Sequence, residues 1–356
     1  MSSYHEKETE RINDKLDEMK STLPEFVCDY LDSLLEQNKS AKTRLNYAFD
    51  CRAFLYYIVQ ECNVALDDIT PEFLGTLTPL DIQRYLTFLT QYRTPEDVAY
   101  NKTHPGANRV HKNSSSAKGR KLASLRGLYK FLMLNQYVNE NPAKLVEIPI
   151  NKRSRDDIIA MDNREVESMI DGAEDGSSLT RRQAQFAKKT QYRDMALLQT
   201  MIGTGVRVSE LVGINIDDID MKSRSILVYR KEGKAQRVYM TDDAAAAIDD
   251  YIRMERKPAD GESALFLSPR TGLRLSVRSV ERIVKKYTAN ITNQKIHAHT
   301  LRATYATNLY ANSDDINLVA DALGHSGLGS VSKYTKSGEM NRKRAPGLLD
   351  YNKKDD

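Results

Sequence analysis

The feature that most limits how this chain can fold is a break in its helical pattern at residues 141–157, NPAKLVEIPINKRSRDD, which contains two prolines. Proline lacks a backbone donor and disfavours helical conformation at the residue before it, so no single helix crosses this segment. The chain has 356 residues, and soluble domains usually contain about 100–200 residues. We therefore predict two domains, residues 1–145 and 158–356, joined by a basic linker at residues 146–157.

The first domain is predicted to be entirely helical. Its apolar residues recur every three or four positions, the spacing that places them on one face of a helix. Residues 93–116 are rich in glycine, proline, asparagine and serine and are predicted to form a loop. The helical spacing is found in four segments: residues 25–38, 43–62, 80–92 and 116–136.

The second domain is predicted to combine helices with a little β-structure. SILVYRKEGKAQRVYM (225–240) is apolar or alternating on both sides of KEGK, which is typical of a β-hairpin with Gly233 in its turn. SALFLS (263–268) is predicted to be a further short strand. The remaining patterns are helical. We therefore expect a mainly α fold with a small antiparallel β-sheet, in which a helical domain precedes an α+β domain.

Charge is unevenly distributed along the chain. Residues 101–155 contain 12 Lys and Arg against two Asp and Glu, whereas residues 1–100 contain 10 against 18. This concentration indicates contact with a polyanion, although a solvated, lysine-rich linker is an equally good interpretation. The candidate contact residues lie mostly off the apolar stripe of helix 116–136 and along the linker: Lys118, Arg120, Lys121, Arg126, Lys152, Arg153 and Arg155.

Composition excludes several classes of protein. Hydrophobic residues make up 40% of the chain and charged residues 29%, which is ordinary for a soluble globular protein. No apolar run approaches the ~20 residues of a membrane span, and the polar N-terminus lacks a signal-peptide core. Cys28, Cys51 and Cys62 form no CxxC pair and lie in apolar contexts, which indicates buried, reduced thiols in a cytoplasm.

The stretch HAHTLRATYATNLY (297–310) carries a candidate anion site. His299 and Arg302 are three positions apart, so on a helix their side chains point to the same side. A histidine and an arginine near a helix N-terminus can together hold an anion, because the backbone N–H groups and the helix dipole add to the arginine fork. The alternative is a capped surface helix without a ligand.

A second arginine lies in GTGVRVSEL (203–211). The two glycines indicate a tight turn after an apolar helix, so Arg207 lies on a bend. Glu210 follows three residues later and could brace it, although the same pair could be a plain surface salt bridge. The motif is no phosphate-binding P-loop, because it lacks the terminal Gly-Lys-Ser/Thr.

Four further candidates lie at the hairpin tip and near the C-terminus. RKEGK contributes Lys231 and Lys234, and LGHSGLGSVSKYTK (323–336) contributes His325 and Tyr334. Each alone is more often a surface or core residue. Two arginines, a lysine, two histidines and a tyrosine, without a carboxylate pair for Mg²⁺, suit one task. They can hold a phosphodiester and attack its phosphorus with a phenolate.

In order and spacing, TGVRVSEL, RKEGK, HTLR, LGH and Tyr334 resemble the motifs of the tyrosine recombinase (phage integrase) family. The layout is most similar to the Xer branch, and within it to the single-protein XerS-type recombinases of Gram-positive bacteria. The resemblance covers the whole second domain. The helical first domain also resembles the core-binding domain of this family.

The resemblance implies a role for each motif residue. Arg207 and Arg302 would clamp the scissile phosphate, with Glu210 supporting the Arg207 loop. Tyr334 would attack phosphorus and form a 3′-phosphotyrosyl link, and the reaction would need no cofactor, ATP or metal ion. His299 would act as the base, and His325 would donate a hydrogen bond to the phosphate. Lys231 would be the acid that protonates the 5′-oxygen, or Lys234 if the turn is shifted.

The resemblance also implies partners. The two domains would form a C-shaped clamp around double-stranded DNA, with the basic residues along its phosphates. The segment after Tyr334 would dock on a neighbouring protomer, giving a homo-tetramer on two duplexes, with any accessory protein left open. Two alternatives remain at this point: a type IB topoisomerase-like enzyme that relaxes DNA, and a non-catalytic DNA-binding accessory protein. The DNA target, and the choice between chromosome dimer resolution and mobile-element integration or excision, are not determined.

Overall fold

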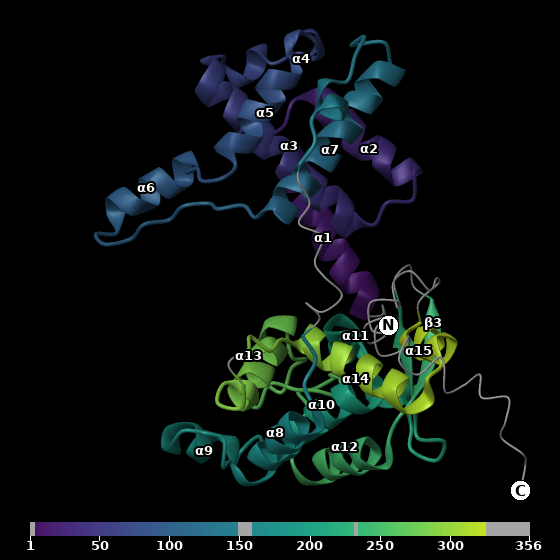
Figure 1. The fold of residues 1–356 in the computed structure, drawn as a ribbon. Coiled ribbons are helices and arrows are strands. Elements are labelled where there is room, and N and C mark those ends of the chain that lie inside the picture. Colours follow the sequence, from purple (N-terminus) through teal and green to yellow (C-terminus); the bar gives the residue numbers. More distant parts are fainter. Residues whose placement is uncertain (1–3, 149–158, 231–233, 293, 325–356) are drawn as a thin grey trace, which may run out of the picture. The chain divides into compact units, whose positions relative to one another are not determined.

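The computed structural model describes residues 4–148, 159–230, 234–292 and 294–324 (Figure 1). The chain divides into two compact units, Met1–Lys152 and Arg153–Asp356. This division falls inside the segment for which we predict the linker. The described residues are mostly helical with one three-stranded antiparallel sheet, which confirms the predicted fold class.

The first unit consists of helices, many of which begin at a side-chain cap. Ser or Thr residues before α3, α4, α5, α6 and α7 accept a hydrogen bond from a backbone N–H of the first turn. Proline in the first turn of α4, α5 and α6 removes a donor that would otherwise lack a partner. The helices are α1 (Tyr4–Lys20), α2 (Glu25–Glu36), α3 (Ala41–Cys62), α4 (Pro71–Thr76), α5 (Pro79–Phe88), α6 (Pro95–Thr103) and α7 (Ser115–Leu134), with 3₁₀ turns η1 (Leu66–Asp68) and η2 (Pro142–Leu145).

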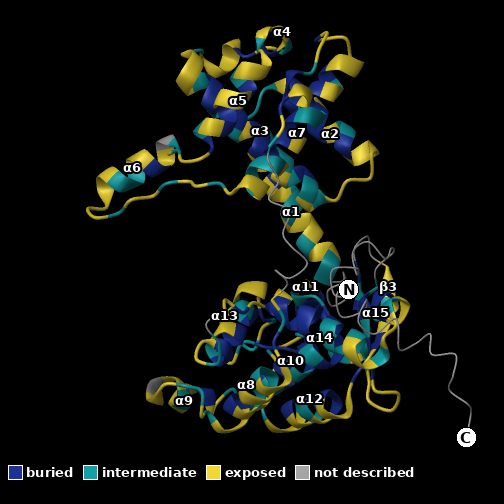
Figure 2. Cartoon of the chain, viewed as in Figure 1, coloured by how far each residue is buried: buried dark blue, intermediate teal, exposed yellow. Residues whose placement is uncertain are grey.

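Helices α3 and α7 carry much of the core of the first unit (Figure 2). Phe54 of α3 and Tyr85 of α5 meet edge to face, with ring centroids 5.0 Å apart. Tyr129 of α7 is fully buried, and its hydroxyl donates to the carbonyl of Leu74. Burial of the Tyr129 hydroxyl requires a hydrogen-bond partner, which restricts how α7 packs against α4.

Two predictions for the first unit are wrong in part. The predicted loop at residues 93–116 contains α6, which extends away from the other helices of the unit (Figure 1). The helix forms because Thr94 and Asp97 make a reciprocal capping box around Pro95. The three cysteines are free, as expected, but only Cys51 is buried and Cys62 is exposed, because Cys62 is the last residue of α3.

The second unit packs around helix α10. This helix contacts α8, α12 and α14, and most of its residues are buried (Figures 1 and 2). Its buried Asp194 accepts from Arg193, Lys286 and the Tyr287 hydroxyl, which ties α10 to α13. The elements are α8 (Asn163–Asp175), α9 (Arg181–Ala187), α10 (Gln191–Thr204), α11 (Val208–Gly213), η4 (Ile216–Asp218), β1 (Ile219–Asp220), β2 (Ser225–Tyr229), β3 (Ala235–Tyr239), α12 (Asp242–Met254), α13 (Val277–Thr288), α14 (Ala298–Ser313) and α15 (Ile316–Leu323).

The sheet has the strand order β1-β2-β3, and all pairs are antiparallel. Strands β2 and β3 form the predicted hairpin, in which Leu227 pairs with Arg237 and Tyr229 pairs with Ala235. A hydrogen bond of 2.7 Å from the Arg230 N–H to the Lys234 carbonyl continues the ladder beyond the last paired residues. The turn at residues 231–233 lies outside the described residues.

Residues 263–268, all of which are described, do not form the predicted strand. They make only isolated bridges, Asn215 with Ala264 and Leu267 with Arg274. Their backbone groups bond both to short backbone segments, residues 214–216 and 273–275, and to side chains, so no continuous strand ladder forms. Arg256 donates to the carbonyl of Ala264, and the N–H of Leu267 donates to the Tyr251 hydroxyl.

Among the described helices, not one combines the length and the apolar character required to cross a membrane.

Candidate active site

A sharp bend after α10 positions Arg207. Gly205 ends the helix in the left-handed region, with φ of 63°. A Cβ at this position would lie 2.3 Å from Cδ1 of Tyr305, so no side chain fits between α10 and α14. The chain therefore turns at a glycine and begins α11 three residues later, at Val208, with Arg207 as its N-cap.

Glu210 braces Arg207 through both of its carboxylate oxygens. Oε1 accepts from the Arg207 guanidinium at 2.7 Å, and Oε2 accepts from the Arg207 backbone N–H at 2.8 Å. The Glu210 side chain is 4% exposed, whereas that of Arg207 is 38% exposed. The buried acid thus fixes the backbone of Arg207 and the base of its side chain, while part of the guanidinium faces solvent.

Arg302 lies on the buried side of α14 and is itself only 1% exposed. Its Nη1 donates to the carbonyl of Gly205 at 2.6 Å, and its Nη2 donates to the carbonyl of Leu323 at 2.8 Å. Nη1 also lies 3.9 Å from Oε2 of Glu210. The structure therefore brings together Arg207 and Arg302, the two arginines predicted from separate motifs, on either side of one carboxylate.

A third arginine joins this cluster, and sequence reasoning missed it. Arg230 follows β2 and donates through Nη1 to Oε2 of Glu210 at 2.7 Å. A signal was present in the sequence: with a period of two along the strand, Ile226, Val228 and Arg230 share the inward face. We name Arg207, Arg230, Arg302 and Glu210 the arginine cluster.

The arginine cluster contains three guanidinium groups and one carboxylate, which leaves an excess of two positive charges. Burial opposes ionisation of Glu210, but the Arg207 N–H and the guanidinium groups of Arg230 and Arg207 outweigh it and hold the pKa of Glu210 below its usual value. The acid is therefore ionised at neutral pH. A cluster with excess positive charge in a partly buried setting is suited to bind an anion such as a phosphodiester.

His299 lies on α14, three positions before Arg302, and it is exposed. The preceding His297 is the N-cap of the helix, and its Nδ1 lies 3.9 Å from Oε2 of Glu281. His297 thus makes a polar contact with α13. Lys234 is described and exposed on the hairpin. Lys231, His325 and Tyr334, to which the resemblance gives three further roles, lie outside the described residues.

The candidate contact residues of α7 lie close to partners within their own unit. Lys121 is buried, with Nζ 3.0 Å from Oδ1 of buried Asp50, and Arg120 pairs with the same carboxylate. Lys121 was expected off the apolar stripe, but positions 121, 125, 128 and 132 share the buried face of the helix.

The other contact residues differ in exposure and partner. Lys118 donates to the Thr90 hydroxyl at 2.7 Å, and Arg126 donates to the carbonyls of Ala143 and Val146. Lys152, Arg153 and Arg155 lie outside the described residues. Of the four candidate contact residues on α7, only Arg120 is exposed.

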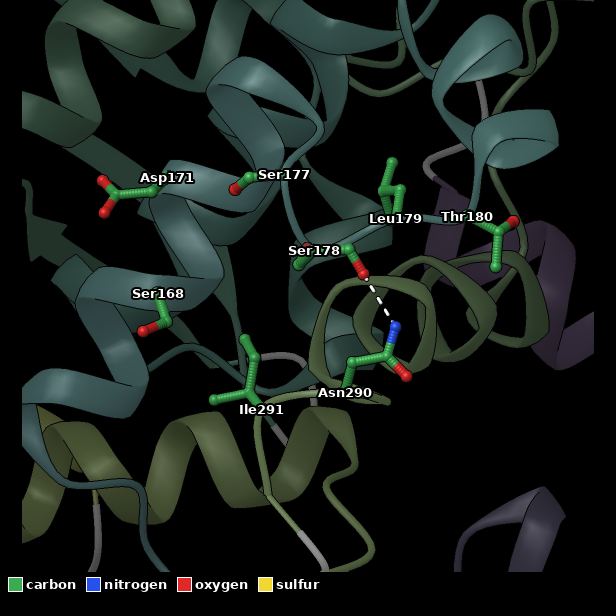
Figure 3. Close-up of a pocket in the computed structure, with 8 residues that line it drawn as sticks. All are labelled: Ser168, Asp171, Ser177, Ser178, Leu179, Thr180, Asn290 and Ile291. Atoms are coloured by element: carbon green, nitrogen blue, oxygen red, sulfur yellow. Dashed lines mark hydrogen bonds between the residues drawn. The ribbon is translucent and has the colours of Figure 1, made fainter.

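A polar pocket of about 520 Å³ lies elsewhere in the second unit (Figure 3). It is lined by residues of α8, of the segment that follows it and of the segment after α13, and Asn290 donates to the carbonyl of Ser178 at 2.8 Å. The lining contains Asp171 and no Lys, Arg or His among the described residues. This pocket therefore lacks the cations that would attract a phosphate.

Comparisons with known proteins agree with this geometry. The family model described as "Phage integrase family" matches residues 160–340. Tyrosine recombinase XerC of Pelobacter propionicus is 31% identical over 302 residues, which cover 84% of this chain and 86% of the relative. Tyrosine recombinase XerS of Streptococcus thermophilus is 27% identical over 352 residues, which cover 92% and 95%.

A solved structure shares the fold. The XerH site-specific recombinase bound to its difH substrate, in a pre-cleavage complex, superimposes with a TM-score of 0.61 at 19% sequence identity, covering 89% of this chain and 82% of the other. At that identity the likeness concerns the fold alone. The family match and the relatives over most of the chain are sufficient for assignment: this protein belongs to the phage integrase family, in its Xer tyrosine recombinase branch.

Proposed function

We propose that this protein is a site-specific DNA recombinase that cuts and rejoins DNA strands through a 3′-phosphotyrosyl intermediate. The observation that carries the proposal is the arginine cluster, in which Arg207 and Arg302 meet around Glu210. Two positive charges beyond the single carboxylate match the negative charge that develops on a phosphodiester under attack. The relatives named as tyrosine recombinases support the same reaction.

In the proposed reaction, the Tyr334 oxygen attacks phosphorus while the bond from phosphorus to the 5′-oxygen breaks. A tyrosine has an unperturbed pKa of about 10, so His299, one helical turn from Arg302, takes its proton. Lys231 protonates the departing 5′-oxygen, and His325 donates a hydrogen bond to the phosphate. The phosphotyrosyl bond keeps the phosphodiester linkage energy, so attack by a 5′-hydroxyl rejoins the strand without ATP or metal.

The proposal extends to the assembly. Two domains hold the duplex as a clamp, and the basic residues of α7 and the linker contact phosphates, so affinity falls as salt rises. The segment after Tyr334 joins four copies on two duplexes. The protein acts in the cytoplasm, either in chromosome dimer resolution or in integration and excision of a mobile element.

The two alternatives are less well supported. A type IB topoisomerase-like enzyme would use similar chemistry as a monomer, but the matched relatives over most of the chain are named recombinases. A non-catalytic accessory protein would have no need for the complete set of motif residues, Arg207, Lys231, His299, Arg302, His325 and Tyr334. Whether the DNA complex contains one copy or four separates the first alternative from the proposal.

The test is covalent capture of DNA. Fragments trapped on the wild-type protein in cells are sequenced, and the recovered sequence is built into a duplex nicked beside the cleavage position. Wild type is expected to accumulate a covalent adduct and Tyr334→Phe none. Tyr239→Phe, at an exposed tyrosine of β3, is the matched control and should behave as wild type. Absence of any adduct with wild type in cells would support the accessory-protein alternative.

A further inference from the structure

The side chain of Arg230 does more than pair with Glu210. Its Nε donates to Oε1 of Gln236 at 3.0 Å, across the hairpin. Gln236 in turn donates through Nε2 to the carbonyl of Asp321 at 3.1 Å, and Nη2 of Arg230 lies 3.5 Å from the carbonyl of Ala322. The two side chains therefore connect both strands of the hairpin to the C-terminal end of α15 and to α11.

The end of α15 leaves space for this pair. Gly324 caps the helix with φ of 62°, a conformation that favours glycine. A Cβ at this position would lie 2.3 Å from Oε1 of Gln236 and 2.8 Å from Nε of Arg230. Any side chain at position 324 would displace the Arg230 and Gln236 side chains, because both pack directly against the glycine backbone.

The hydrogen-bonded pair of Arg230 and Gln236 lies next to a proposed catalytic residue in the sequence. Arg230 directly precedes Lys231, to which the proposed function assigns protonation of the leaving 5′-oxygen. We propose that Arg230 and Gln236 form a bracket that fixes the start of the hairpin tip against the arginine cluster and α15, and so positions Lys231. This inference rests on the proposed function.

Arg230 is a positioning residue in this proposal and does not contact DNA. Its side chain is 7% exposed, compared with 38% for Arg207. Its Nη1 and Nε donate to Glu210 and Gln236, and its Nη2 faces the Ala322 carbonyl. A guanidinium so occupied orients its neighbours, whereas the more exposed Arg207 can reach a phosphate.

The proposal is tested with a substrate that needs no general acid. The duplex recovered by covalent capture is made in two forms, with oxygen or with sulfur bridging phosphorus and the 5′-carbon at the cleavage position. A thiol has a pKa of about 8.5, far below that of an alcohol, so sulfur leaves as the thiolate without a proton. A defect in positioning Lys231 therefore slows cleavage of the oxygen form and not that of the sulfur form.

Single-turnover cleavage by the full-length protein is measured for Arg230→Met, Gln236→Leu and a matched control, Arg237→Met. Arg237 lies on the same hairpin but donates to Ser225, away from α15 and Glu210. We expect the first two variants to lose about 10- to 100-fold on the oxygen form and to approach wild type on the sulfur form. Arg237→Met is expected to cleave both forms at wild-type rates. Lys231→Ala is expected to lose more than the first two variants on the oxygen form and to approach wild type on the sulfur form.

Other outcomes overturn the proposal in distinguishable ways. Equal losses on both forms by Arg230→Met and Gln236→Leu would mean that the pair serves the arginine cluster or the fold rather than Lys231. Wild-type rates on the oxygen form would mean that the bracket positions nothing. Because Gln236 is only partly buried, its variant decides the question if Arg230→Met fails to fold. If covalent capture with wild type yields no DNA, no duplex can be built; this result would count against the proposed function itself, and the inference would fall with it.

Discussion

Arg230 and Glu210 are 20 residues apart in the chain, yet the guanidinium Nη1 lies 2.7 Å from the carboxylate Oε2. Through this contact the hairpin and α11 share one buried acid, which also holds Arg207 and lies 3.9 Å from Arg302. A single carboxylate thus organises three arginines from three different elements. Removal of the Glu210 carboxylate should therefore reduce both the stability of the second unit and the activity of the site.

Glu210→Gln should strongly destabilise the second unit. The change keeps the shape of the side chain but removes the negative charge that pairs with buried Arg230, and breaking a buried ion pair typically costs about 3–5 kcal/mol. Urea unfolding followed by circular dichroism measures the loss, since the chain contains no tryptophan. Asp249→Asn removes an exposed pair with Arg253 and should cost less than about 1 kcal/mol. Equal losses for the two variants would contradict the role given to Glu210.

The stabilising effect of Glu210 should disappear in acid. Its folded-state pKa lies below the unfolded value of about 4.3, so its contribution is fully present above that pH and is lost as pH falls through the folded pKa. The difference in unfolding free energy between wild type and Glu210→Gln should therefore be largest at neutral pH and shrink below about pH 4.3. Urea unfolding at a series of pH values from neutral to acid measures this difference. A difference that stays constant across the series would show that the charge is not responsible.

Gly205→Ala should cost more than the same change at another left-handed glycine. Gly205 combines a positive φ with a Cβ position 2.3 Å from Tyr305, and its carbonyl accepts from Arg302. Gly261 also has a positive φ, of 75°, but open space around it. Gly261→Ala should lose only the backbone term of about 1–2 kcal/mol. Thermal unfolding compares the two, and a loss at Gly205 no larger than that at Gly261 would mean that Tyr305 moves aside without cost.

Asp50→Asn should destabilise the first unit more than Lys121→Met does. The first change leaves the buried Lys121 ammonium without a negative partner, at a cost of about 3–5 kcal/mol, whereas the second leaves Asp50 paired with Arg120. The double variant should recover most of the loss, because neither buried charge remains. Urea unfolding of wild type, the two single variants and the double variant gives the four unfolding free energies of this double-mutant cycle. A double variant as unstable as Asp50→Asn alone would indicate that Lys121 is not the group left unpaired.

Local patterns predicted those elements whose cause is local. The hairpin at residues 225–240 and the helices predicted at residues 25–38 and 80–92 depend on alternation, caps and fixed backbone angles, and all are present. Helix α6 was missed because a Thr-Pro-x-Asp capping box is hidden in a stretch whose composition suggests a loop. Residues 263–268 resemble a strand but bond only through isolated bridges and side chains, which no local pattern reveals.

The candidate site shows the same division. The sequence by itself determined which chemistry was available. The motifs around Arg207 and Arg302 indicated a phosphodiester substrate, because guanidinium groups, a phenol and imidazoles without paired carboxylates are suited to bind and cleave one. Only the tertiary structure placed Arg230 in the cluster and Lys121 on a buried acid. The physical reason is that burial and pairing depend on elements distant in the chain. Glu210, Arg230 and Arg302 meet only after α11, the hairpin and α14 have packed, and a charge becomes structural when packing excludes water from it.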